Sequence, residues 1–277
     1  GGPWNDKSVS ENQGERGRLI SDYIQSRSHL LRTAKIATEN LSAAIRLGDE
    51  NFAVITREYS SFKKKGTELV PIFSLLDEPI MEKFASNLGL SNEDFIGQHV
   101  FNPWARALAE MAAIYGWQPN SAHPQDYLVV FKDGKPTGEI VIRDVMDAKI
   151  DINFVGDDPE MLHQFEKVLQ PDSGQNDLVK GEINVAAKPF HLNYGPHGMK
   201  FEPLIFEMNQ IFVNVYHTIT GIQLPLYETG LGMNVWDTLD KNPHYERWVR
   251  HIKEIGQIAR PVQQSKSAAG SCQRIFK

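Results

Sequence analysis

The chain has 277 residues, of which 41% are hydrophobic, and this is enough for a substantial core in one large domain or two small ones. The net charge of −6 and the pI near 5.9 argue against general nucleic-acid binding, which needs a basic surface. The sequence contains no apolar run of about 18 residues and no signal-peptide pattern, so we expect no membrane partner.

Cys272 is the only cysteine of the sequence. One cysteine can form no intramolecular disulfide, and it cannot supply the four thiolates that an iron–sulfur cluster of the all-cysteine type requires. We therefore expect no iron–sulfur cluster. The reducing cytoplasm is the simplest location for a chain with this cysteine content.

The first part of the chain has the apolar spacing of helices. Residues 1–14 are polar and are expected to form a disordered leader. From Glu15 to Leu47, and again from Phe52 to Lys65, apolar residues recur near helical spacing, which predicts two amphipathic helices. Gly48 is the predicted stop between them.

The remaining sequence alternates helices with a few strands. Residues 150–155 alternate apolar and polar side chains and predict a strand, whereas residues 170–200 are rich in Gly and Pro and predict loops. Residues 261–277 are expected to form a tail. Further helices are predicted at 80–88, from Ser91 onward, and at 103–115, 159–169, 204–222 and 233–258.

These elements predict an α+β fold that is mostly helical, with a small antiparallel sheet built around a central β-hairpin. We expect residues 15–260 to form a single domain. A helical N-terminal subdomain at residues 15–100 is an open alternative within it.

The predicted hairpin at residues 127–142 is the most informative segment. Tyr127–Phe131 is rich in β-branched and aromatic residues, Lys132–Gly134 has turn chemistry, and Glu139–Ile142 returns as the second strand. Because the open ends of an antiparallel pair lie side by side, the polar groups that flank the hairpin should meet. These groups are His123, Gln125, Asp126, Arg143 and Asp144.

Such a cluster can bind a metal ion and stabilise an anion. Magnesium prefers a few carboxylates together with phosphate oxygens, and Asp144 follows a strand, where it could bind the metal directly. Arg143 could stabilise charge on a leaving group. A purely structural interpretation is that Arg143 and Asp126 form an ion pair that closes the hairpin while His123 caps the loop. Two more carboxylates nearby are expected to be solvated: Asp147 and Asp151.

Residues 121–147 resemble the central motif of the IucA/IucC family of NRPS-independent siderophore synthetases, and the resemblance extends more weakly over residues 60–220. In the C-terminal palm of that family, a segment Glu-Ala-His-Gly-Gln-Asn is followed by an apolar strand, a turn, a second strand and Arg-Asp. The matching residues are Ala122, His123, Gln125, Arg143 and Asp144. The departures are Ser121, Pro124 and Asp126, which replace the family's Glu, Gly and Asn.

The resemblance implies ATP- and magnesium-dependent adenylation of a polycarboxylic acid such as citrate, followed by displacement of AMP by an amine or hydroxylamine. It implies catalytic roles for His123 and Arg143, cofactor binding by Gln125 and Asp126, and metal ligation by Asp144 and Gln125. The implied small molecules are a carboxylic acid or a siderophore intermediate. The family's enzymes are longer, so a homodimer or a partner subunit would supply the missing first half.

Three other classes of protein share features with the hairpin and its flanking residues. The family shares its C-terminal region with FhuF-like ferric reductases, whose cysteine-ligated cluster this chain cannot form. A kinase-like phosphotransferase would use Asp126 as base and Asp144 as magnesium ligand, but the Asn expected after the base is missing from the sequence that follows, Tyr-Leu-Val-Val. A non-catalytic binding module of the same fold agrees with the departures from the motif. The last two classes stay open.

Overall fold

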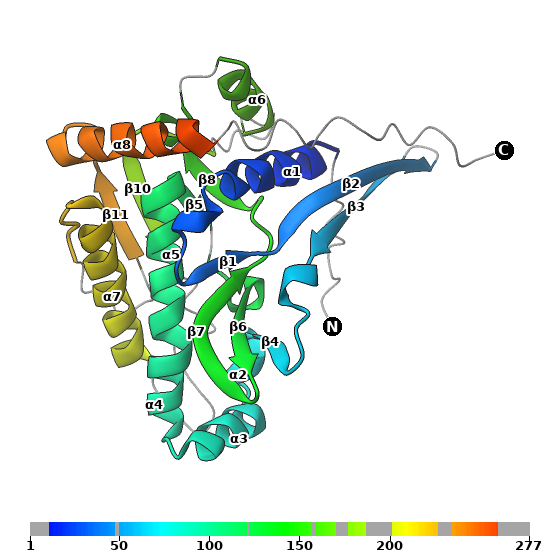
Figure 1. Ribbon diagram of the computed structural model, residues 1–277, viewed down its shortest axis with the longest axis vertical. Coiled ribbons are helices and arrows are strands. Elements are labelled where there is room, and N and C mark those ends of the chain that lie inside the picture. The colour runs from blue at the N-terminus through cyan, green and yellow to red at the C-terminus, as the bar shows by residue number, and fades with distance from the viewer. Residues whose placement is uncertain are drawn as a thin grey trace.

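The computed structural model describes residues 11–47, 50–120, 122–156, 159–169, 177–186, 201–226 and 234–259. Within these ranges the chain has the predicted α+β architecture, in which several helices surround small sheets (Figure 1). None of the helices in the described ranges is both long and apolar enough to cross a membrane.

The central sheet contains the predicted hairpin. Strands β6 (Tyr127–Lys132) and β7 (Lys135–Ile142) pair antiparallel and are the two inner strands of a sheet with the order β1-β7-β6-β4. β4 (Thr67–Pro71) lies antiparallel to β6, whereas β1 (Ala34–Ile36) lies parallel to β7. The predicted small sheet around a central hairpin is therefore present, with one parallel edge strand, β1, added from an N-terminal segment.

The first predicted helix is wrong beyond Gln25. Helix α1 spans Glu11–Gln25, so it also includes part of the predicted leader, and residues 1–10 lie outside the described ranges. A 3₁₀ turn, η1 (Ser28–Leu30), leads from α1 to β1, and the chain then continues as β2 (Thr38–Leu47). The apolar spacing of this segment alone fits a helix, but pairing with neighbouring strands makes it extended.

The second predicted helix, at residues 52–65, is also wrong. These residues form most of β3 (Glu50–Glu58), which pairs antiparallel with β2, and then the 3₁₀ turn η2 (Ser60–Phe62). Two sequence signals favour the strand: the β-branched run Val54-Ile55-Thr56 and the Gly48-Asp49 pair between the two strands. The proposed helical subdomain thus contains several strands.

Helix α5 (Asn102–Tyr115) is the centre of the core. From Pro103 to Tyr115 every residue except Arg106 is buried, as expected for a helix that is packed on all sides. Its one buried carboxylate, on Glu110, accepts hydrogen bonds of 2.9–3.1 Å from the backbone N–H groups of Arg32, Thr33 and Ala34, and so holds the start of β1.

The helices that precede α5 begin close to the predicted positions. Ser91 is the N-cap of α4 and its Oγ accepts a hydrogen bond from the Asp94 N–H at 3.0 Å, which confirms the predicted helix start. The elements between β4 and α5 are α2 (Ile72–Leu75), α3 (Glu78–Leu88), α4 (Asn92–Ile96) and the π-helical turn η3 (Gly97–Phe101).

The C-terminal half adds short strands and three longer helices. The predicted strand at residues 150–155 is shorter and lies earlier, because the 3₁₀ turn η5 (Ile152–Phe154) replaces its second half. Two strands occur in the predicted loop region, and another precedes the last helix, which begins at Pro243 rather than Met233. The predicted tail, residues 261–277, lies outside the described ranges. The elements are β5 (Trp117–Pro119), η4 (Pro124–Asp126), β8 (Ala148–Asp151), α6 (Pro159–Leu169), β9 (Leu178–Val179), β10 (Glu182–Ala186), α7 (Glu202–Thr220), β11 (Asn234–Thr238) and α8 (Pro243–Ala259).

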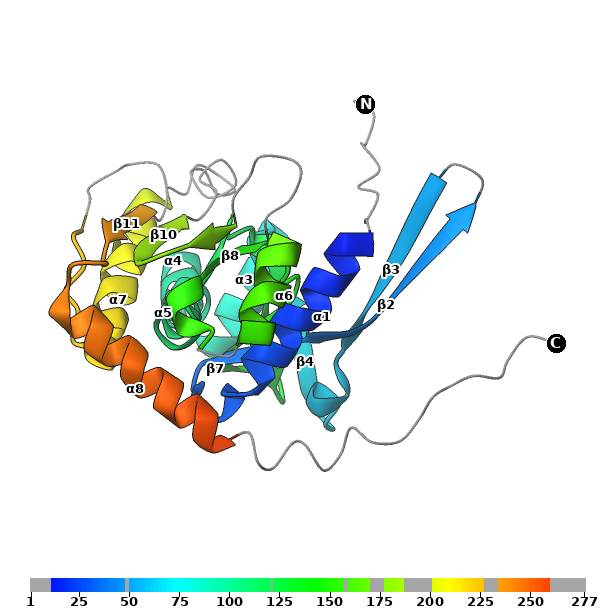
Figure 2. The same ribbon diagram turned by 90° about the horizontal axis from the view of Figure 1, so that it is seen from above.

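The two views show how these elements surround the central sheet. α5 and α7 run side by side next to the sheet, and α8 crosses near one end of both (Figures 1 and 2). The β2–β3 hairpin extends away from the other elements beyond α1, while its base lies near β1 and the open end of β6–β7. This base is where the candidate site forms.

Candidate functional site

The open end of the β6–β7 hairpin brings the predicted flanking residues together. Tyr127 pairs with Ile142, and one residue further out the Arg143 N–H donates to the Asp126 carbonyl oxygen at 2.9 Å. Asp126 and Asp144 are close enough for the charge of one to raise the pKa of the other. The prediction that these segments meet is therefore right.

A second strand pair adds two residues that the sequence did not predict. Arg57, near the end of β3, donates from Nε to Glu39 Oε1 of β2 at 2.9 Å, and its Nη2 lies 3.2 Å from Asp144 Oδ1. We call Glu39, Arg57, Asp126, Arg143 and Asp144 the hairpin-end cluster. It joins the base of the β2–β3 hairpin to the open end of β6–β7.

The charged side chains of the hairpin-end cluster are largely buried, which is uncommon for charged groups. The Glu39 side chain has 0% exposure, and those of Arg57 and Asp144 are 29% and 27% exposed. Among the described residues, Glu39 Oε2 and Asp144 Oδ1 are buried oxygens without a hydrogen bond of good geometry. The backbone N–H of Asp144 nevertheless lowers the pKa of Glu39, and Arg57 Nη2 forms an ion pair with Asp144 Oδ1. Buried carboxylate oxygens normally have well-placed donors, so the incomplete pairing of Asp144 leaves it able to bind a cation that displaces Arg57.

Asp144 is also held in an uncommon backbone conformation, with φ of 62°. Asp tolerates this left-handed region better than most residues, but the conformation is uncommon outside glycine and often occurs at functional sites. The predicted ion pair between Arg143 and Asp126 is not found in the described part of the chain, where Asp144 pairs with Arg57 instead. Arg57 therefore takes the structural role that was considered for Arg143.

The surroundings raise the pKa values of Asp126 and Glu39 above the ordinary values for these side chains. Burial, followed by the negative charge of Asp144, raises the pKa of Asp126 to about 6, although Arg143 and a hydrogen bond from Gln125 oppose the rise. Burial likewise raises the pKa of Glu39, against the opposing charge of Arg57. With three carboxylates against two guanidinium groups, the cluster can take up a proton or a cation near neutral pH.

The Asp126 shift predicts a pH-dependent stability. Its folded-state pKa of about 6 exceeds the ordinary value of 3.8, so the folded state binds the proton more tightly and loses stability as the pH rises from about 4 to about 6. We expect a loss of about 1 kcal/mol, after allowance for screening of this half-buried group. Urea unfolding of wild type and Asp126→Asn across this range should show the slope in wild type and a flatter profile in the variant. Equal slopes would contradict the prediction.

The cluster fits a magnesium ion better than a metal held entirely by protein. No group of three His, Cys, Asp or Glu side chains that could hold a metal is found within the described ranges. Magnesium needs fewer protein ligands, because it keeps waters and takes phosphate oxygens from a substrate. Asp144 would meet that requirement if the cation displaced Arg57 Nη2 from its Oδ1. Gln125, the other residue implied as a ligand, is exposed and precedes Asp126.

The other predicted site residues have simpler structural positions. His123 is the N-cap of η4, and its Nδ1 accepts the Gln125 N–H at 3.3 Å, which is the capping role considered from the sequence. Gln125 is exposed. Ser121, where the motif first departs from the family, lies outside the described ranges.

Two nearby carboxylates behave differently from each other. Asp147 is exposed as expected. Asp151 is not solvated: it is 2% exposed and accepts hydrogen bonds from Tyr245 Oη at 2.5 Å, Gly181 N at 3.1 Å and Asn153 N at 3.1 Å. These bonds tie β8 to α8 and to the β9–β10 connection, so Asp151 is a structural residue of the core.

Glu39 and Arg57 were missed because their segments were predicted as helices. On a strand they lie at the ends of β2 and β3 that face the hairpin, which a helical interpretation cannot indicate. The Gly48-Asp49 turn signal would have predicted the β2–β3 hairpin and brought residues near 38 and 58 together. It would not have shown that this base meets Asp144, because that contact depends on tertiary packing.

Comparison with known proteins finds similarity in structure but not in sequence. No family model and no curated protein matches the chain. Among solved structures, the chain is similar to the aerobactin synthetase IucC from a hypervirulent pathotype of Klebsiella pneumoniae, with 16% sequence identity and a TM-score of 0.47. The likeness covers 86% of this chain and 48% of that one, so the chain spans about half the length of that synthetase.

Proposed function

We propose that the chain is a siderophore-biosynthesis-type ligase, or the palm part of one, that activates a polycarboxylic acid with ATP and magnesium. The observation that supports this proposal is the meeting of Asp126, Arg143 and Asp144 at the open end of the hairpin. These residues lie in the segment that resembles the IucA/IucC motif. The proposal places the protein in the cytoplasm, where ATP is available.

In this proposal each residue has a defined task. Asp144 and Gln125 would hold magnesium, which when bound would neutralise charge on the phosphates of ATP. Arg143 stabilises negative charge on the acid or on the departing pyrophosphate. Asp126, with a pKa of about 6, can accept the proton of an incoming amine at neutral pH. His123 orients the loop by its cap on Gln125 and would contact the reacting carboxylate.

Two alternatives have specific support. A non-catalytic module that binds a carboxylic acid or a siderophore intermediate is favoured by Arg57, which already neutralises Asp144 and Glu39 without a metal. A kinase-like phosphotransferase remains the alternative in which Asp126 is the base and Asp144 the metal ligand.

Calorimetric titration of the purified chain with magnesium and ATP tests the site. We expect Asp144→Asn to weaken magnesium–ATP binding about tenfold, because one negative ligand of the cation is lost. Asp147→Asn is the matched control, since Asp147 is an exposed carboxylate three residues away. Thermal melts of both variants check that each is folded. Equal affinity in Asp144→Asn and wild type would contradict the assignment of the metal ligand.

The reaction class is tested by product analysis with labelled ATP. Carboxylate-dependent exchange of pyrophosphate into ATP would support the ligase, with citrate as the first acid to be assayed. Transfer of the γ-phosphate to an added acceptor would instead identify a phosphotransferase. Citrate binding without exchange and without phosphate transfer would support the binding module and contradict the ligase for this chain.

A further inference from the structure

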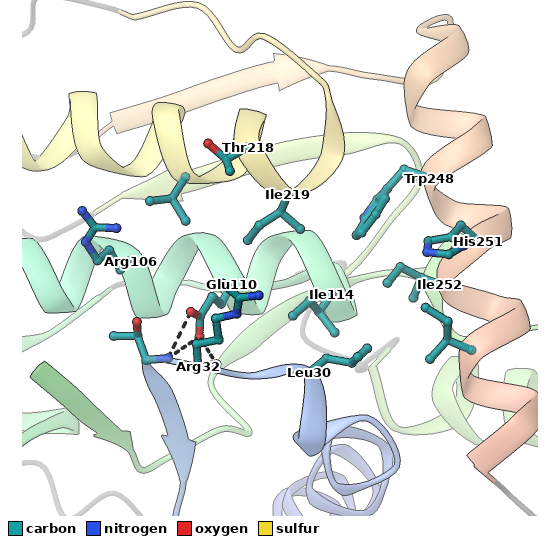
Figure 3. A pocket seen from close by; sticks show the side chains of 13 residues that line it. Leu30, Arg32, Arg106, Glu110, Ile114, Thr218, Ile219, Trp248, His251 and Ile252 are labelled. Atoms are coloured by element: carbon teal, nitrogen blue, oxygen red, sulfur yellow. Dashed lines mark hydrogen bonds between the residues drawn. The ribbon is translucent and has the colours of Figure 1, made fainter.

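A second candidate site lies away from the hairpin-end cluster. An open cavity of about 480 Å³ is lined by α5, α7, α8, the end of η1 and the segment between η1 and β1 (Figure 3). This volume lies within the range of small-molecule binding sites. The motif at the hairpin contributes no residue to its lining, so it is independent of the proposed ATP site.

One end of the cavity is mainly apolar, with the His251 imidazole beside Trp248 as its polar group (Figure 3). Ile114 of α5, Ile219 of α7 and Trp248 of α8 face one another across it (Figure 3). The Trp248 indole Nε1 donates to the Ala113 carbonyl oxygen at 2.6 Å, which fixes the ring against α5. Because three helices supply this wall, it is formed by the packing of the fold rather than by a mobile loop.

The other end of the cavity is polar and carries two guanidinium groups. Arg106 and Arg32 lie near Glu110 at this end, away from Trp248 (Figure 3). Arg106 Nε donates to Asn102 Oδ1 at 2.7 Å, and neither arginine forms an ion pair with an acidic side chain in the described part of the chain. Glu110 is the only carboxylate in the lining, and its oxygens already accept the three backbone N–H groups at the start of β1.

The charges therefore leave this end with an excess of one positive charge, opposite an apolar wall. An anion with an apolar body satisfies both ends: a carboxylate receives the donors of an arginine, and an aryl or alkyl group covers the isoleucines and Trp248. A neutral apolar molecule would make no use of the two guanidinium groups, which are exposed to solvent. A polyacid such as citrate would place charge against the apolar wall, which is unfavourable.

We infer that this cavity binds a small monocarboxylate with an aromatic or alkyl body, with its carboxylate at Arg106 and Arg32. The ring or chain lies along the apolar wall toward Trp248. The spacing along α5 supports one continuous surface, because residues 106, 110 and 114 are four apart and share a helix face. The inference stands independently of the reaction proposed for the hairpin-end cluster.

Titration with 2-naphthoate, followed by calorimetry, tests the ligand class, and the matched neutral probe is 2-naphthamide. We expect saturable one-to-one binding of the acid, with the amide bound at least about tenfold more weakly because it lacks the charge. Equal affinity for acid and amide, or no binding of the acid at millimolar concentration, would overturn the inference.

Two variants then locate the site. Arg106→Gln should weaken binding of the acid about tenfold and leave that of the amide nearly unchanged; Arg106 is exposed, so the fold should tolerate the change. Arg18→Gln, an equivalent loss of charge on the exposed face of α1, should leave acid binding unchanged. Val215→Phe adds a ring to the cavity lining and should abolish binding of both probes.

Two other outcomes of these experiments would contradict the inference. Acid binding that is unaffected by both Arg106→Gln and Val215→Phe would place the ligand elsewhere. Sedimentation could also reveal a dimer that Val215→Phe disrupts; in the absence of acid binding, that result would assign the cavity to a second copy of the chain. Circular dichroism of each variant confirms folding, and the comparison of acid with amide in wild type does not depend on any variant.

Discussion

Replacing Arg57 with Met should destabilise the folded chain by about 3 kcal/mol at pH 8, the typical cost of removing one partner of a buried ion pair. Glu39 has 0% side-chain exposure and Arg57 Nε is its hydrogen-bond donor at 2.9 Å. Without Arg57, the Glu39 carboxylate must stay charged and unpaired in the interior or take up a proton. Met retains most of the volume of the arginine stem, so the lost charge dominates the result.

The effect should depend on pH in a defined direction. Burial already raises the pKa of Glu39 above its ordinary 4.5, and Arg57 opposes that rise. Removal of Arg57 therefore raises the pKa further, so the variant loses additional stability as the pH increases above about 4.5. Urea unfolding at pH 5 and pH 8 should give a smaller loss at pH 5. The double variant Glu39→Gln with Arg57→Met should recover part of the loss at pH 8, and no recovery would argue against a role for the buried charge.

Gly116→Ala should have a comparable effect on stability, also about 3 kcal/mol, from strain and overpacking together. Gly116 ends α5 with φ of 61°, and a Cβ there would lie 2.8 Å from Asp151 Cβ and from a ring carbon of Phe154. Asp151 cannot move freely, because its carboxylate accepts three hydrogen bonds, two of them buried, and its N–H donates to the Gly116 carbonyl oxygen at 2.9 Å.

Gly89→Ala provides the matched control. Gly89 ends α3 with φ of 68°, but nothing lies within 4 Å of the position that a Cβ would occupy. Both substitutions therefore carry the cost of placing alanine at positive φ, about 1 kcal/mol. Only the Gly116 variant adds a steric clash with Asp151 and Phe154. Thermal or urea unfolding of the two variants measures the difference. Equal destabilisation would show that the region around Asp151 adapts to the added methyl group.

The hairpin and the helices after it could be predicted because their signals are local. Turn residues at 132–134, the β-branched and aromatic strand before them and the cap residue Ser91 specify backbone conformation with little help from distant residues. The same local logic predicted that Asp126 and Arg143 meet, since antiparallel pairing places the two ends of a hairpin together.

The segment from residue 26 to 65 could not be predicted in the same way. Its apolar spacing fits a helix, yet β1 adds to the central sheet beside β7, and β2 pairs with β3. Strand pairing gives each backbone group a partner in a neighbouring segment, and this gain outweighs a weak helical preference. Glu39 and Arg57 were missed for this reason.

The sequence by itself therefore determined the central hairpin, the helices on either side of it and the residue types gathered at its open end. The tertiary structure alone decided that Arg57 binds Asp144, that Asp151 is buried among donors, and that three helices line a mainly apolar cavity with arginines at one end. The physical reason is range: turns, caps and hairpins depend on neighbouring residues, whereas ion pairs, burial and cavities depend on the packing of segments far apart in the chain.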